Sequence, residues 1–153
     1  MEKLRVEDLM TSDVISVRQN EDLATLHDLM MDNHIRHIPV VDDENCVVGL
    51  ISHRDLVGRA ISGNEQLPVT ELQQLLRQTK VREIMMTGVE TVEPDEEVEE
   101  AARIMLESKY GCLPVTENGQ IVGILTEADF VRCVADEQRE IRNNARREDV
   151  RVV

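Results

Sequence analysis

Hydrophobic positions along the chain fall into two kinds of pattern, short apolar runs and stripes with helical spacing. The β-branched runs at 14–17 and 89–92 are typical of strands. Each is followed by a polar turn and then by apolar residues three or four positions apart, which predicts an amphipathic helix of about three turns. These apolar residues are Leu23, Leu26 and Met30 after the first run, and Val98, Ala101 and Met105 after the second. Asn20 and Asp95 are the predicted N-caps of the two helices.

Each predicted helix leads into a predicted hairpin. Continuous apolar runs at 38–41 and 113–116 are typical of buried strands, and the proline in each must lie where no ladder donor is needed. A short polar turn follows each run, and the runs at 46–52 and 120–126 close the hairpins. A second helix is predicted to begin immediately afterwards. The chain therefore contains two units of the order β-α-β-β-α.

The two units are copies of one sequence. A shift of 75 positions, which becomes 74 after a one-residue difference in the hairpin turn, aligns eleven identical residues. They are Val6 and Val81, Met10 and Met85, Val14 and Val89, Val17 and Val92, Glu21 and Glu96, Met30 and Met105, Pro39 and Pro114, Val40 and Val115, Val48 and Val122, Gly49 and Gly123, and Asp55 and Asp129. One unit of about fifty residues buries too little surface to be stable alone. We therefore predict an α+β, sandwich-like fold in which the two copies pack sheet to sheet about a pseudo-twofold axis.

This repeat divides the chain into four segments. The first repeat covers residues 1–62, and a linker at 63–78 contains a predicted helix with Leu72, Leu75 and Leu76 on one face. The second repeat covers 79–135, and a helical extension covers 136–153. The alternating acidic residues and arginines of the extension are typical of a solvated helix face, and less often of a dimer contact.

Composition and charge exclude several classes of partner. The net charge of −14 and the presence of just two aromatic residues, Tyr110 and Phe130, argue against a nucleic-acid-binding surface. No run of 18 apolar residues and no signal-peptide pattern occurs, which argues against a membrane protein. Cys46, Cys112 and Cys133 are far apart and odd in number, as expected for free thiols in a reducing compartment. We therefore expect a cytoplasmic protein.

The junction between the last strand and the last helix of each copy carries the candidate chemistry. The sequences GLISHRDL and GILTEADF place Ser52 three residues before Asp55, and Thr126 three residues before Asp129. This spacing is that of a capping box, in which the hydroxyl and the carboxylate satisfy the first backbone groups of a helix. The same hydroxyl, with the free N–H groups of a helix start, also suits a phosphate, and the carboxylate suits a ribose diol. Both interpretations remain open at this point.

With these motifs the chain resembles a tandem pair of CBS domains, the Bateman module. The resemblance rests on VEDLM…VISV…IRHIPVVD…VVGLISHRDL and its copy VREIM…VETV…YGCLPVTE…IVGILTEADF, which cover about residues 4–60 and 79–135. It implies a regulatory module that binds AMP, ADP, ATP or S-adenosylmethionine in clefts between the repeats and uses no catalytic cofactor. It also implies a homodimer. Because the chain carries no fused catalytic or transport domain, we expect it to be a stand-alone protein that signals to a separate effector protein.

The resemblance assigns roles to residues by position. Asp55 and Asp129 match the ribose-binding aspartate, and Ser52 and Thr126 match the hydroxyl on the phosphate side. The segments that match the adenine pocket supply Thr11, Ile15 and Ser16 from the first copy, and Met86, Glu90 and Thr91 from the second. Basic residues for a phosphate are Arg36, His37, His53 and Arg54, all in the first copy.

The two copies differ at these basic positions. The second copy has Gly111, Cys112, Glu127 and Ala128 there, with Lys109 nearby. A polyphosphate needs local cations in so acidic a chain, because charge-assisted hydrogen bonds are the strong ones. We therefore expect one cationic cleft that suits a nucleotide phosphate. The other cleft is then suited to a less charged adenosyl ligand or stays empty.

Two other classes of function were weighed. An enzyme is disfavoured because no candidate nucleophile has a partner in its own motif and no Walker lysine loop, GxGxxG or GxSxG motif occurs. His34 and His37 lack the further ligands that a metal site needs. A structural dimerisation or interaction module with empty clefts is the alternative, in which Asp55 and Asp129 serve as helix caps alone. Ligand-dependent stability distinguishes this alternative from a sensor.

Overall fold

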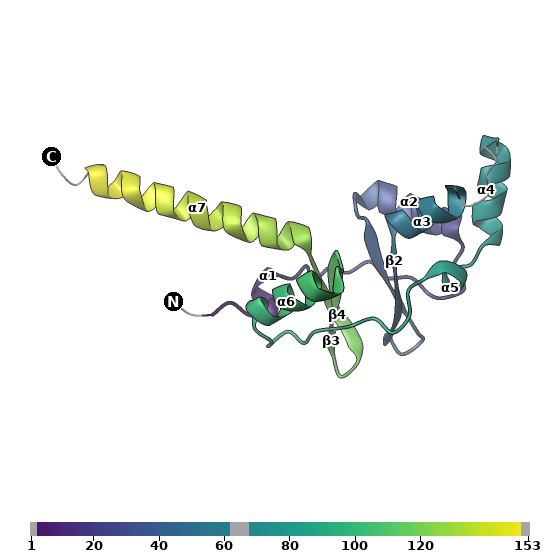
Figure 1. Cartoon of the computed structure of the whole chain (residues 1–153), viewed down its shortest axis with the longest axis horizontal. Coiled ribbons are helices and arrows are strands. Elements are labelled where there is room, and N and C mark those ends of the chain that lie inside the picture. Colours follow the sequence, from purple (N-terminus) through teal and green to yellow (C-terminus); the bar gives the residue numbers. More distant parts are fainter. Residues whose placement is uncertain (1–2, 62–67, 151–153) are drawn as a thin grey trace.

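The computed structural model describes residues 3–61 and 68–150 (Figure 1). It contains two short antiparallel sheets and the helices that cover them, in an α+β arrangement. The elements of the first half are α1 (Val6–Leu9), α2 (Leu23–Asn33), β1 (His37–Val41), β2 (Val47–Ser52) and α3 (His53–Ile61). Those that follow are α4 (Val69–Gln78), α5 (Val81–Ile84), α6 (Val98–Ser108), β3 (Cys112–Glu117), β4 (Gln120–Thr126) and α7 (Glu127–Val150).

Both predicted hairpins are confirmed. Strand β1 pairs with β2, and β3 pairs with β4, each with a register shift after the fourth residue of its first strand. Pro39 sits in a parallel bridge in which its oxygen accepts a hydrogen bond from Val17 N and Val41 N donates to Val17 O. No donor at position 39 is needed, as expected, and Pro114 is placed in the same way beside Val92.

The predicted strands at 14–17 and 89–92 are wrong in extent. Each forms a single parallel bridge, at Val17 and at Val92, rather than a strand. The residues just before each bridge leave the sheet and cross to the other repeat, so they have no continuous partner strand. Their β-branched composition reflects burial at the boundary between the repeats.

The predicted N-caps are also wrong by two residues. Asp22 caps α2, and its carboxylate accepts a hydrogen bond from Thr25 N at 2.8 Å. Glu97 occupies the cap position of α6 without a side-chain cap bond. The residues proposed from the sequence, Asn20 and Asp95, lie in the preceding turns.

The segments that begin each repeat exchange places. Helix α1 hydrogen-bonds to the second repeat, where Val6 N donates to Glu96 O at 2.9 Å and Val98 N donates to Leu4 O at 3.0 Å. Helix α5 makes the matching bonds with the first repeat, and Figure 1 shows α1 beside α6 and α5 below α2 and α3. Each half of the molecule therefore contains one short helix from the other copy.

Each half has its own core, and a third apolar cluster joins them. Leu50 from β2, Cys112 from β3 and Ile124 from β4 are buried together, with Val14 and Val89 packed against them. Burial raises the pKa of the Cys112 thiol to about 12. The two sheets thus face each other through this cluster, which agrees with the predicted sheet-to-sheet packing.

The two additional helices are confirmed. Helix α4 packs on α2 and adds Leu76 to the first core, while Leu72 and Leu75 are half-buried. The loop predicted before α4 lies outside the described residues except at its two ends. Helix α7 begins directly after β4 and runs out from the body of the molecule (Figure 1). No helix in the described ranges is long and apolar enough to cross a membrane.

Candidate ligand cleft between the repeats

A pair of backbone bridges brings residues of the two copies together. Thr11 pairs with Ile124 through two hydrogen bonds of 2.9 Å, and Met86 pairs with Leu50 through bonds of 2.8 and 3.0 Å. The leading segment of one repeat is therefore fixed against the last strand of the other. Each candidate site consequently draws its side chains from both copies.

Two glycines make this close approach possible. A Cβ atom on Gly123 would lie 2.5 Å from the Met10 sulfur and 3.2 Å from Thr11 O. On Gly49 it would lie 2.6 Å from the Met85 sulfur and 3.0 Å from Met86 O. The glycine shared by the two repeat motifs thus has a steric reason, because any side chain would push the crossing segment away.

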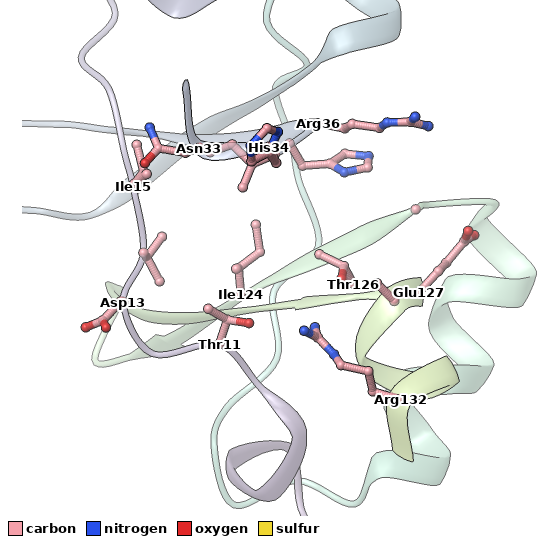
Figure 2. Close-up of a pocket in the computed structure, with 15 residues that line it drawn as sticks. Thr11, Asp13, Ile15, Asn33, His34, Arg36, Ile124, Thr126, Glu127 and Arg132 are labelled. Carbon is pink, nitrogen blue, oxygen red and sulfur yellow. The ribbon is translucent and has the colours of Figure 1, made fainter. Parts of the chain in front are cut away.

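A cleft of about 690 Å³ opens beside the Thr11–Ile124 bridge (Figure 2). Its first-repeat wall consists of Thr11, Asp13, Val14, Ile15, Asn33, His34, Ile35, Arg36 and His37. Its second-repeat wall consists of Gly111, Ile124, Thr126, Glu127, Ala128 and Arg132. The cleft therefore has an apolar part, which its aliphatic residues line, and a polar end with side chains of both charges.

The Ser52–Asp55 pair forms a complete capping box. Ser52 N and Ser52 Oγ both donate to Asp55 Oδ2 at 2.8 Å, and Asp55 N donates to Ser52 Oγ at 3.1 Å. The capping interpretation is therefore realised at α3. It uses the same atoms that a ribose or a phosphate would need.

The Thr126–Asp129 pair is similar, but Asp129 has more partners. Its Oδ2 accepts from Thr126 N at 2.8 Å and from Thr126 Oγ1 at 3.3 Å. Its Oδ1 accepts from Thr11 Oγ1 at 3.5 Å and from the Arg132 guanidinium at 2.5 Å. Asp129 is 5% exposed, so this carboxylate is buried among donors from both repeats and from its own helix.

His37 stands where the two repeats meet. Its imidazole lies against Gly111 and lines the cleft. Burial lowers the pKa of His37 below its ordinary value, while the carboxylates of Glu127 and Asp55 partly offset this and Arg36 adds to it. The side chain therefore favours the neutral form and can act as a hydrogen-bond partner without a full charge.

The cleft gathers a part of the candidate residues. Thr11, Ile15, Arg36, His37 and Thr126 line it, and Asp129 lies behind Arg132 at its edge. The remaining candidates are not among its lining residues; they are Ser16, Ser52, His53, Arg54, Asp55, Met86, Glu90 and Thr91. Met86 sits in the opposite bridge, against Leu50, and the Ser52–Asp55 pair follows the same strand as Leu50.

The arrangement corrects one detail of charge. The cations Arg36 and Arg132 and the carboxylates Asp13 and Glu127 all line this cleft, so its charge is mixed rather than purely basic. His53 and Arg54 belong to α3, outside this lining. The cationic set predicted for one cleft is thus divided between two places.

Arg132 was missed by the sequence reasoning. A signal for it exists, because it follows Asp129 by three residues on a predicted helix and must share a face with it. Asn33, at the end of α2, and Asp13, in the segment that crosses to the other repeat, were missed as well, and their positions carry no comparable signal. His34 and His37 both line the cleft, but the described residues contain no group of three or more side chains that could hold a metal ion.

Comparison with known proteins is consistent with this geometry. The CBS domain model matches residues 6–62 and 81–136. The MJ1404 protein of Methanocaldococcus jannaschii is 31% identical over 139 residues, which are 89% of this chain and 33% of that protein. This chain spans well under two thirds of the first curated relatives it matches.

Two solved structures have the same fold and contain ligands. CBSX2 of Arabidopsis thaliana in complex with AMP is 29% identical, with a TM-score of 0.72 over 88% of this chain and 98% of that chain. The CBS domain pair of MJ0100, in complex with 5′-methylthioadenosine and S-adenosyl-L-methionine, is 25% identical, with a TM-score of 0.72 over 86% and 99%. The matched segments, the duplicated architecture and these likenesses together show that this chain belongs to the CBS domain family and carries two CBS domains in tandem.

Proposed function

We propose that this chain is a regulatory module that binds an adenosine-containing ligand, AMP, ADP, ATP or S-adenosylmethionine, in the cleft between its repeats. The observation that carries the proposal is the cleft itself, in which the Thr11–Ile15 segment of one copy meets the helix start at Thr126 of the other. Relatives with the same fold contain AMP in one case and S-adenosylmethionine in another. The module has a binding role in this proposal and no catalytic one.

The lining residues suit the parts of such a ligand. Val14, Ile15, Ile35 and Ile124 offer an apolar slot for a purine ring. Asp129 offers a carboxylate for the ribose hydroxyls, and Thr126 offers a hydroxyl beside the free N–H groups of the first turn of α7. Arg36 and His37 lie at the polar end, where a phosphate or another charged substituent would be placed.

A second site is proposed at the opposite bridge. There the adenine-lining residues would be Ser16, Met86, Glu90 and Thr91, and the ribose and phosphate side would comprise Ser52, Asp55, His53 and Arg54. The Met86–Leu50 bridge supports this placement, because it holds the second leading segment against the strand that ends at Ser52. The number of ligands bound per chain remains a prediction.

Signalling would follow from a change in the relative orientation of the repeats. A ligand that contacts both copies can favour one orientation over another, but only by its difference in affinity for the two. Helix α7 begins at the cleft and runs out from the body, so it would transmit the change to a separate effector chain. We also propose that two copies pair as a homodimer.

A specific observation favours the structural alternative as well. The carboxylates of both Asp55 and Asp129 make the hydrogen bonds of helix caps in this structure. If capping is their whole role, the clefts are empty and the module serves in dimerisation or interaction alone. The two functions predict different responses to ligand.

The test is thermal unfolding of the full chain with AMP, ADP, ATP and S-adenosylmethionine, for wild type and Asp129→Ala. A ligand at a hundred times its Kd should stabilise the fold by about 2.7 kcal/mol, which raises the Tm of a chain of this size by roughly 5–10 °C. Asp129→Ala should remove the part of that shift that comes from the described cleft if the carboxylate holds the ribose.

Asp22→Ala is the matched control. Asp22 caps α2 through Thr25 N but is not among the lining residues of the described cleft, so its loss should lower Tm while the ligand shift remains. Asp55→Ala reports on the second site in the same assay. No shift with any of the ligands, together with equal destabilisation in all three variants, would rule out the sensor and favour the structural module.

A further inference from the structure

Arg132 covers the buried carboxylate that the proposed function assigns to ribose. Its guanidinium donates to Asp129 Oδ1 at 2.5 Å, while the Arg132 side chain is 67% exposed and that of Asp129 is 3% exposed. Figure 2 shows Arg132 pointing into the cleft between Thr11 and Thr126. The exposed guanidinium therefore stands between the cleft and the buried acid.

Arg132 also lies at the boundary of two hollows. It lines the cleft, and with Thr11 it also lines a neighbouring groove of about 720 Å³ between the N-terminal segment and α7. Asp129 is among the lining residues of the groove but not of the cleft. A ribose entering the cleft would consequently meet Arg132 before it reached Asp129.

From this geometry we infer that Arg132 is a displaceable cover of Asp129 that selects ligands with an anionic group beside the ribose. The inference rests on the proposed function. A ribose hydroxyl that binds Asp129 Oδ1 must replace the hydrogen bond from Arg132, which costs part of the binding free energy. A nucleoside recovers nothing from the released guanidinium, whereas a phosphate or carboxylate in the cleft gains a charge-assisted hydrogen bond from it.

This selection belongs to one site. The residue of the first repeat that matches Arg132 is Gly58, which carries no side chain to cover Asp55. Arg132 also lies on the second turn of α7, so its release would occur at the base of the helix that leaves the body. Anion selection and the link to α7 thus depend on the same side chain.

The test is calorimetric titration of the full chain with AMP and with adenosine, for wild type and Arg132→Gln. Wild type should bind AMP more tightly than adenosine. Arg132→Gln should lower the ratio of AMP to adenosine affinity by about ten-fold or more, because only AMP loses a charge-assisted hydrogen bond and such bonds contribute about 1.5–3 kcal/mol. The same variant should leave adenosine unchanged or bind it more tightly, because Asp129 is uncovered.

Arg103→Gln is the matched control. Arg103 is an exposed arginine that pairs with Glu99 and Glu100 one turn earlier on α6, and it lines neither hollow. Its loss should leave both affinities within two-fold of wild type. Comparison of the AMP to adenosine affinity ratio in the two variants therefore separates the specific effect of Arg132 from the general effect of losing one positive charge.

Several results would overturn the inference and leave the proposed function standing. A ratio of AMP to adenosine affinity that is the same in wild type and Arg132→Gln would do so, as would an equal loss of AMP and adenosine affinity. Binding of S-adenosylmethionine that Arg132→Gln does not alter, without binding of AMP, would have the same meaning. A wild-type chain that binds none of these ligands would contradict the proposed function itself.

Discussion

His37 connects the chemistry of the cleft to the pH dependence of the fold. Its pKa is lowered by burial, so the protonated form is disfavoured in the folded chain relative to the unfolded one. The resulting stability is fully present above the unfolded value of 6.5 and is lost as the pH falls below it. The free energy of unfolding should therefore decrease in mild acid, because the His37 side chain takes up a proton more readily in the unfolded chain.

We expect His37→Gln to weaken the dependence of stability on pH. Between about pH 7.5 and 5.5 the Tm of wild type should fall more than that of the variant, because glutamine takes up no proton. Thermal melts at the two pH values provide the measurement. His27→Gln is the control, since His27 lies on α2 outside the cleft. An equally steep fall in wild type and His37→Gln would show that other groups carry the effect.

Individual residues of the site were predictable only in part. Ser52, Asp55, Thr126 and Asp129 follow from a motif that is local in the sequence, and its hydrogen bonds are as the capping spacing predicts. The spacing places Arg132 on the same helix face as Asp129, but the burial of Asp129 and the position of Arg132 over it follow only from the structure, because the same charge pattern elsewhere on the helix forms a solvated face.

Helix α4 shows how an element outside the repeat becomes part of a core. Leu76 is 9% exposed and packs among the apolar residues of the first half, whereas Val69 on the same helix is 73% exposed. The amphipathic pattern of the segment predicted a helix with one apolar face but gave no partner for that face. The partner is α2.

Leu76→Ala should lower the free energy of unfolding by about 2–3 kcal/mol, because it leaves a cavity in the first core. Val69→Ala, on an exposed position of the same helix, should change it by less than about 0.5 kcal/mol. Urea denaturation of both variants provides the comparison. Similar values for the two would mean that α4 is not integrated in the core.

At the level of elements, periodicity predicted well and boundaries less so. The hairpins and the longer helices follow from spacing, since each buries one face in a core close to it in sequence. The segments at 14–17 and 89–92 differ, because their environment is the other repeat. A pattern within one copy contains no information about a partner in the second copy.

For the whole molecule, the exposed part of α7 is the surface that best suits the proposed homodimer. On this helix Val131, Val134 and Ile141 are more than half exposed. Beyond its first turns the helix has few tertiary contacts with the rest of the chain. A helix without tertiary packing is marginal in water. The stretch with Asp136, Glu137, Arg139 and Glu140 has a net negative charge and precedes the basic Arg142 and Arg146, so two antiparallel copies would place opposite net charges together.

Light scattering after size exclusion should give a dimer for wild type and a shift toward monomer for the double variant Val134→Glu, Ile141→Glu. Leu106→Glu is the control, because Leu106 is 81% exposed on α6. A monomeric wild type would contradict the homodimer. A dimer that the α7 substitutions leave intact would assign the contact to another surface.

The exchange of α1 and α5 between the halves has a consequence for synthesis. Val6 hydrogen-bonds to Glu96, so α1 leaves the ribosome before its partner and must wait for a residue made 90 positions later. At roughly 5–20 residues per second this delay amounts to about 5–20 s. The second repeat thus depends on a helix that is made before the first repeat, and loss of α1 would damage the half of the molecule that is translated later.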